Sequence, residues 1–206
     1  MRKSISIWIA PALRWLAAFA LAIGLSPPHA LAQQALLIKP LAETRVAELP
    51  AGELYWRIDN FDTVDKAKAA AGPWSLVVEA AGKNWLFTLG PAGGSSREAV
   101  KVAEVGPIAR VNAAQYLLRV NNASGPPGSV TPIHSHPGSE AFLVLAGEQS
   151  IRHAHGVLRV KPGQAEAGHG ADQAMQVSST GSTDLHALVM FVVDADRPFS
   201  TPAKLP

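Results

Sequence analysis

Short apolar runs separated by glycine and proline dominate the chain after residue 72. Runs that alternate or continue in apolar residues cover residues 74–79, 85–89, 101–105, 115–120, 140–145, 149–153, 157–160, 174–177 and 185–193. Breakers such as the stretches 125–128 and 161–163 lie between them. Many short strands joined by such turns predict an all-β sandwich or barrel.

The preceding region is expected to contribute one short helix and little regular structure. Thr63 is a suitable cap for a helix over 64–71, and Gly72-Pro73 ends it. Residues 33–53 show no clear period, and a short strand at 36–38 is expected to stop before Pro40. We therefore divide the chain into residues 33–114, an extension that packs on the barrel or adds strands to it, residues 115–197, the barrel domain, and a tail over 198–206.

The first 32 residues are typical of a secretory signal peptide. A basic start is followed by an apolar run over 15–25 and by Ala30-Leu31-Ala32, an A-x-A cleavage site. Arg14 interrupts the apolar region, and the remaining run is short for a bilayer span. We expect export to the periplasm or the medium, with no stable membrane insertion after cleavage.

Removing this segment changes the charge of the chain. The full sequence has 18 basic and 16 acidic residues and a formal charge of +2, but three of the basic residues lie in the signal. The mature part therefore has a formal charge of −1, which gives no electrostatic reason to expect nucleic acid binding. The chain has no cysteine, so imidazole and carboxylate groups are the candidate metal ligands.

The candidate chemistry lies in the sequence GSVTPIHSHPGSEAFLVLAG over residues 128–147. Alternate residues of a strand face the same side, so His134 and His136 project together. If the strand that begins at Glu140 pairs back on the first, its carboxylate joins them, and Phe142 and Val144 line the same interior. Two imidazoles and a carboxylate suit a divalent transition metal such as Fe, Mn, Zn, Ni or Cu. The alternative is a set of ordinary polar residues beside a turn.

This segment resembles the first motif of the cupin superfamily, G-x5-H-x-H-x3-E-x6-G. Gly128, His134, His136, Glu140 and Gly147 occupy its five fixed places. The resemblance implies a cupin-type jelly-roll β-barrel, here with one short N-terminal helix, and three metal ligands. It also implies a homodimer.

The second cupin motif is degenerate in this chain. Ala174 stands where the resemblance places a fourth ligand, a histidine. His169, in a glycine-rich loop, is a candidate replacement, and an exposed loop histidine is the equal alternative. Gln176 shares the strand face of Ala174 and is expected to line the pocket. Water or substrate in the fourth position is a further alternative.

Three other histidines are expected to lie outside the site. His153 and His155 repeat the His-x-His spacing without a following carboxylate, and they precede Gly156, a candidate hairpin tip. We interpret them as exposed turn residues. His186 is either a pocket residue or a satisfied core histidine, and the second interpretation is favoured.

The sequence thus predicts an exported cupin-domain protein that binds a divalent metal and a small molecule. An oxygenase or isomerase is one such function, with Glu140 as a ligand or a base. A module that binds a small ligand without catalysis, or that has a structural role, is the alternative. The residues do not select a substrate or a reaction.

Overall fold

The computed structural model describes residues 34–206. The predicted signal peptide, residues 1–32, lies outside the described residues. Within the described part of the chain, no helix is long and apolar enough to cross a membrane.

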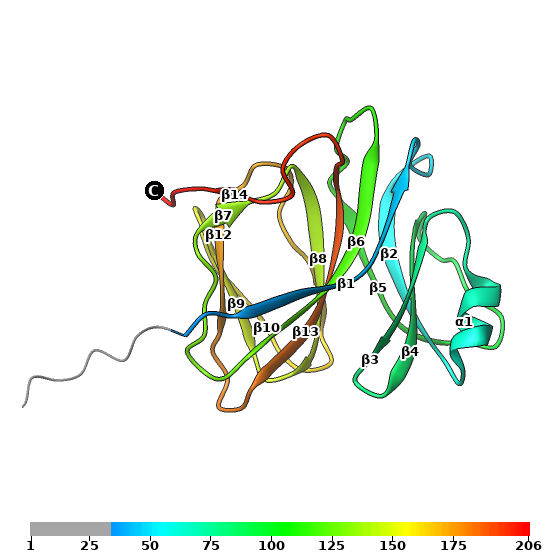
Figure 1. The fold of residues 1–206 in the computed structure, drawn as a ribbon, viewed down its shortest axis with the longest axis horizontal. Helices are drawn as coiled ribbons and strands as arrows, with labels where there is room; N and C mark the ends of the chain where they lie inside the picture. Colours follow the sequence, from blue (N-terminus) through cyan, green and yellow to red (C-terminus); the bar gives the residue numbers. More distant parts are fainter. Residues whose placement is uncertain (1–33) are drawn as a thin grey trace, which may run out of the picture. The chain divides into compact units, whose positions relative to one another are not determined.

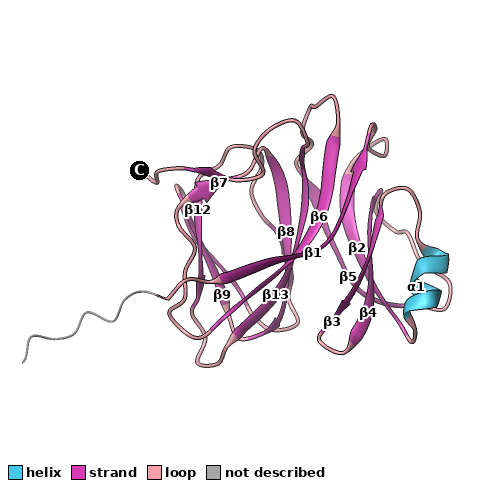
Figure 2. Cartoon of the chain, viewed as in Figure 1, coloured by secondary structure: helices cyan, strands magenta, loops and turns pink. Residues whose placement is uncertain are grey.

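Eight strands form a jelly-roll barrel (Figures 1 and 2). They are β6 (Tyr116–Gly125), β7 (His134–Ser135), β8 (Gly138–Ala146), β9 (Gln149–His153), β10 (Gly156–Val160), β11 (Ala165–Ala167), β12 (Met175–Ser179) and β13 (Leu185–Asp194). One sheet has the order β6-β13-β8-β11 and the other β10-β9-β12-β7. Strands early in the barrel therefore pair with strands late in it, as in a long hairpin folded over on itself.

Two further strands extend the barrel sheets. β1 (Leu37–Val46) pairs with β6 and β14 (Thr201–Pro202) pairs with β7. The expectation that Pro40 stops the first strand is wrong, because β1 continues past it with a register shift between Pro40 and Ala42. β1 is the edge strand of its sheet, and an edge strand accommodates a proline that has no N–H to donate.

A third, four-stranded sheet packs on the outside of the barrel. It has the order β3-β4-β2-β5, formed by β2 (Leu54–Phe61), β3 (Ser75–Ala80), β4 (Lys83–Gly90) and β5 (Val100–Ile108). Its inner face places Trp56, Trp85 and Phe87 in one core with Leu143 and Met190 of the barrel. The other face is covered by α1 (Val64–Ala70), whose Ala67 packs among buried side chains (Figure 1). The helix prediction is confirmed, and the Lys66 backbone N–H donates to Thr63 Oγ1 over 3.3 Å.

Strand β13 shows why the C-terminal apolar run lacks alternation. Leu188, Met190 and Val192 face the outer sheet, while Val189 and Phe191 face the barrel interior. A strand covered on both faces reads as a continuous apolar run. This strand and its neighbours β6 and β8 form the middle of three sheet layers and position the pocket.

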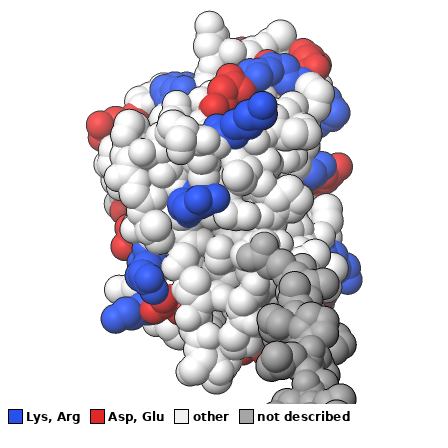
Figure 3. All heavy atoms as spheres, turned by 90° about the vertical axis from the view of Figure 1, so that its left-hand side faces the viewer, with Lys and Arg blue, Asp and Glu red and all other residues white. Residues whose placement is uncertain are grey.

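Charged side chains lie at the surface of these layers in mixed groups. On the face in Figure 3, basic and acidic side chains lie near one another between broad uncharged areas. Exposed ion pairs include Arg159–Glu148 at 3.0 Å and Arg197–Asp172 at 2.6 Å. Such pairs add little stability because water screens them.

Candidate functional site

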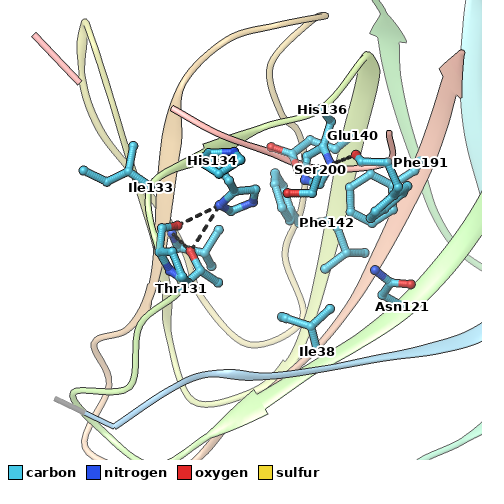
Figure 4. Close-up of a pocket in the computed structure, with 15 residues that line it drawn as sticks. Ile38, Asn121, Thr131, Ile133, His134, His136, Glu140, Phe142, Phe191 and Ser200 are labelled. Atoms are coloured by element: carbon cyan, nitrogen blue, oxygen red, sulfur yellow. Dashed lines mark hydrogen bonds between the residues drawn. The ribbon is translucent and has the colours of Figure 1, made fainter. Parts of the chain in front are cut away.

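A pocket of about 420 Å³ opens between the two barrel sheets and is lined by 15 residues (Figure 4). His134, His136, Glu140 and Phe142 are all among them. His134 belongs to β7, and Glu140 and Phe142 belong to β8. The structure therefore brings the three proposed ligands to one end of one pocket.

Backbone carbonyls accept a hydrogen bond from the Nδ1 atom of both imidazoles. His134 Nδ1 lies 2.8 Å from the carbonyl oxygen of Pro132, and His136 Nδ1 lies 2.6 Å from that of Phe199. A carbonyl only accepts, so both Nδ1 atoms carry a proton, and in the neutral form of such a ring Nε2 is the electron-pair donor. Metal-binding histidines are commonly oriented in this way. The two ring centroids are 4.9 Å apart and the rings meet edge to face.

Burial controls the charge of Glu140 and His136. Glu140 is 3% exposed and its Oε1 is buried without a hydrogen-bond partner. Desolvation raises the pKa of its carboxyl to about 8. His136 is 5% exposed, and burial lowers its pKa to about 4 against the opposing hydrogen bond to Phe199. Both groups are therefore neutral near pH 7 when no cation is bound.

The donor atoms fit a divalent transition metal once the Glu140 carboxyl has lost its proton. Two imidazoles that donate through Nδ1 to carbonyls, and a buried carboxyl oxygen without a partner, are the ligand types that such ions take. The arrangement is nevertheless not that of a preformed site. Within residues 34–206, no group of three or more His, Cys, Asp or Glu side chains is placed to hold a metal ion.

The glycine-rich loop sends His169 away from the triad. Gly168 lies against Glu140, where an added Cβ would be 2.6 Å from Glu140 Cγ. The His169 ring instead packs on His153 at 4.2 Å between centroids, and its Nδ1 is buried without a partner. Burial and the neighbouring imidazoles lower the pKa of His169. The structure therefore does not bring His169 to His134 and His136 as a fourth ligand.

Two predicted pocket residues lie elsewhere. Val144 faces the barrel interior but is fully buried in its apolar core, outside the pocket lining. Gln176 is also outside it, because Met175 and Val177 are the residues of β12 that point inward. The Gln176 amide instead contacts Arg152 Nη2 and the Thr131 carbonyl. The second cupin motif, which is degenerate in this chain, predicted that Ala174 and Gln176 face the pocket. This is wrong by one residue, and a shift of one residue in a strand exchanges its inward and outward faces.

Two of the three other histidines differ from expectation. His153 lies at the end of β9 and is half-buried against His169, whereas His155 is exposed as predicted. His186 is half-buried at a register shift of β13, outside both the core and this pocket. His186 lies at the beginning of β13, where neither the outer sheet nor the opposite barrel sheet covers it fully.

The sequence did not predict the pocket residues that come from the C-terminal tail and from β6. Phe199, Ser200 and Pro202 line it from the C-terminal tail, for which the sequence predicted no part in the site. The Phe199 ring packs 4.8 Å from His136 and 4.9 Å from Phe191. Asn121 of β6 lines the other end, is 2% exposed, and has an Oδ1 without a partner. The signal that could have identified Asn121 is its polar side chain directly after the predicted strand over 115–120.

No protein-family model and no curated protein sequence matches the chain. The solved structures that it matches include cupin and double-stranded β-helix proteins. The DMSP lyase DddQ from Ruegeria pomeroyi is 24% identical with a TM-score of 0.36, over 42% of this chain and 43% of the lyase. A cupin-like protein from Thermotoga maritima is 16% identical with a TM-score of 0.38, over 43% of this chain and 65% of its own. A double-stranded β-helix protein from Klebsiella pneumoniae is 20% identical with a TM-score of 0.37, over 42% and 75%.

These likenesses span less than half of the chain and carry no conclusion about activity. The assignment of the barrel to the cupin-type jelly roll rests on the strand order and on the motif over residues 128–147.

Proposed function

We propose that the protein binds a divalent transition metal through His134, His136 and Glu140 and holds a small molecule beside it in the barrel pocket. The observation that carries the proposal is the pair of Nδ1–carbonyl hydrogen bonds, 2.8 Å and 2.6 Å, which leaves both Nε2 atoms free next to a buried carboxylate. A bound divalent ion would act as a Lewis acid toward an oxygen of the ligand.

Metal binding requires the three side chains to rearrange. The side chains do not form a preformed cluster, and Glu140 must give up its proton before it can act as a ligand. The pKa of about 8 makes this exchange dependent on pH. We therefore expect metal affinity to rise with pH as the carboxyl loses its proton.

The second candidate is a metal-free module that binds a small apolar molecule. It is favoured by the lack of a preformed cluster and by Met175 and Val177, which are buried and point inward where a fourth ligand was expected. In this case the two histidines and Glu140 act as hydrogen-bonding groups at one end of the pocket.

Metal content separates the two candidates. The wild-type protein, purified without chelator, is expected to hold close to one equivalent of a divalent transition metal by elemental analysis. The double variant His134→Ala/His136→Ala is expected to lose it. His153→Ala/His155→Ala removes an imidazole pair of the same spacing outside the pocket and is the matched control. Equal metal content in all three proteins would refute metal binding at the triad.

A further inference from the structure

The pocket has a charge pattern that restricts its ligand. Among its lining residues there is no lysine, arginine or aspartate, and Glu140 is the one acidic side chain. Most of the others are apolar, among them Ile38, Phe142 and Phe191 (Figure 4). An anionic group away from the metal end would lose its hydration without gaining a cationic partner, which is strongly unfavourable.

The guanidinium of Arg119, which lies against the lining residue Phe199, is already engaged outside the lining. Arg119 lies 4.2 Å from the centroid of the Phe199 ring. Its Nε and Nη2 donate to Glu43 Oε2 over 2.8 Å and 2.5 Å. Because Phe199 lines the pocket and Arg119 does not, the aromatic ring faces the ligand and the guanidinium faces Glu43.

A second polar group faces the pocket from the opposite end. Asn121 and Phe142 both pair with Val189 of β13, while Glu140 pairs with Phe191 two residues further along. Two strand spacings of about 4.8 Å therefore separate the backbones of Asn121 and Phe142 across the sheet. Figure 4 shows Asn121 and Ile38 at the end remote from His136 and Glu140.

Asn121 is itself unusual for a barrel interior. It is 2% exposed and its Oδ1 has no hydrogen-bond partner. A buried amide oxygen of this kind is unfavourable unless a donor satisfies it. A hydroxyl or N–H group of a ligand in the pocket would supply this donor.

We infer that the ligand is an uncharged, mainly apolar small molecule whose hydrogen-bond donor meets Asn121 Oδ1 at the end remote from His134, His136 and Glu140. The inference rests on the ligand-binding part of the proposed function and does not require the metal. The volume of about 420 Å³ lies in the usual range for small-molecule pockets.

Three ring compounds of similar size test this ligand class. 4-Ethylphenol carries a donor, ethylbenzene carries none, and 4-ethylbenzoate carries a negative charge. Their Kd values are measured by ligand-observed NMR on the metal-loaded and on the chelator-treated protein. We expect 4-ethylphenol to bind about tenfold more tightly than ethylbenzene, as one neutral hydrogen bond allows, and 4-ethylbenzoate to bind most weakly to the chelator-treated protein. Tighter binding of the benzoate to that protein would overturn the inference.

Variants of Asn121 test the role of its amide. Asn121→Leu keeps the branched shape of the side chain and is expected to remove the tenfold preference for the phenol over ethylbenzene. Asn121→Thr, which keeps an oxygen acceptor, is expected to retain part of it. Asn122→Leu is the matched control, because Asn122 neighbours it on β6 and lies outside the pocket. An unchanged preference in folded Asn121→Leu would refute the inference. Metal content, measured on the same samples, tests the triad separately.

Discussion

Replacing Glu140 by glutamine removes the ionisable group while keeping the shape of the side chain. Burial raises the pKa of the Glu140 carboxyl from 4.5 to about 8, so the metal-free folded protein holds this proton more tightly than the unfolded chain. The stability that this contributes is fully present below pH 4.5 and is lost as the pH rises through 8. At about 1.4 kcal/mol per pH unit, the full difference is about 5 kcal/mol.

A narrower pH range separates Glu140 from His136. Burial lowers the pKa of His136 from 6.5 to about 4, so its contribution is present above pH 6.5 and is lost as the pH falls through 4. Between pH 6.5 and 8 the imidazole is neutral in the folded state and loses its remaining protons in the unfolded state. Because His136 is present in both proteins, the difference between their stabilities comes from Glu140. Over the ~1.5 pH units of this range, wild type should lose about 2 kcal/mol relative to Glu140→Gln.

Urea unfolding in the presence of chelator measures this difference. The free energy of unfolding of wild type is expected to fall between pH 6.5 and 8. Over the same range, this fall should exceed any change in Glu140→Gln by about 2 kcal/mol. Excess divalent metal is expected to abolish the fall in wild type, because the cation replaces the proton on the carboxylate. Parallel pH profiles of the two chelator-treated proteins would refute the assignment of Glu140 as a buried neutral acid.

Three other predictions follow from the packing and from the sequence. Gly147→Ala should destabilise the protein by about 1–3 kcal/mol in urea, because Gly147 has a φ of 71° and an added Cβ would lie 2.6 Å from the Asp184 carbonyl oxygen. Gly128→Ala, at a φ of 88° but with open space, should cost less; an equal cost would contradict the role of this contact. Phe199→Ala should cost about 1–3 kcal/mol through lost packing on His136 and Phe191, whereas Val157→Ala, at a residue 54% exposed, should change stability by less than about 0.5 kcal/mol; similar effects would contradict this packing. Mass spectrometry of the exported protein should show a chain that begins at Gln33, and an intact residue 1 would contradict cleavage.

The fold was predictable where local signals agreed with the final packing. The turn residues and the short apolar runs indicated an all-β barrel, and Thr63 and Gly72 bounded the helix. The strand over Leu54–Phe61 was missed, although Leu54, Trp56 and Ile58 alternate with polar residues and are fully buried. This strand, β2, is central in the four-stranded outer sheet because it pairs with β4 and β5. No local sequence pattern reveals this pairing.

The residues of the candidate site were also predictable only in part. His134, His136 and Glu140 lie within seven residues and reach one pocket. The expected pairing of their two strands is wrong, because β7 pairs with β12 and β14 whereas β8 belongs to the other barrel sheet. Asn121 and Phe199 reach the same pocket from distant segments, and their places depend on strand register and on the path of the tail. Gln176 shows the cost of a one-residue error, since it exchanged the two faces of β12.

Anomalous scattering from crystals of the protein loaded with Co²⁺ tests the central claim most directly. A single strong peak within coordination distance of His134 Nε2, His136 Nε2 and a Glu140 carboxylate oxygen is the predicted result. A peak beside His153, His155 and His169 with none at the triad would contradict the account, as would a cobalt-free pocket in crystals grown with the metal in excess.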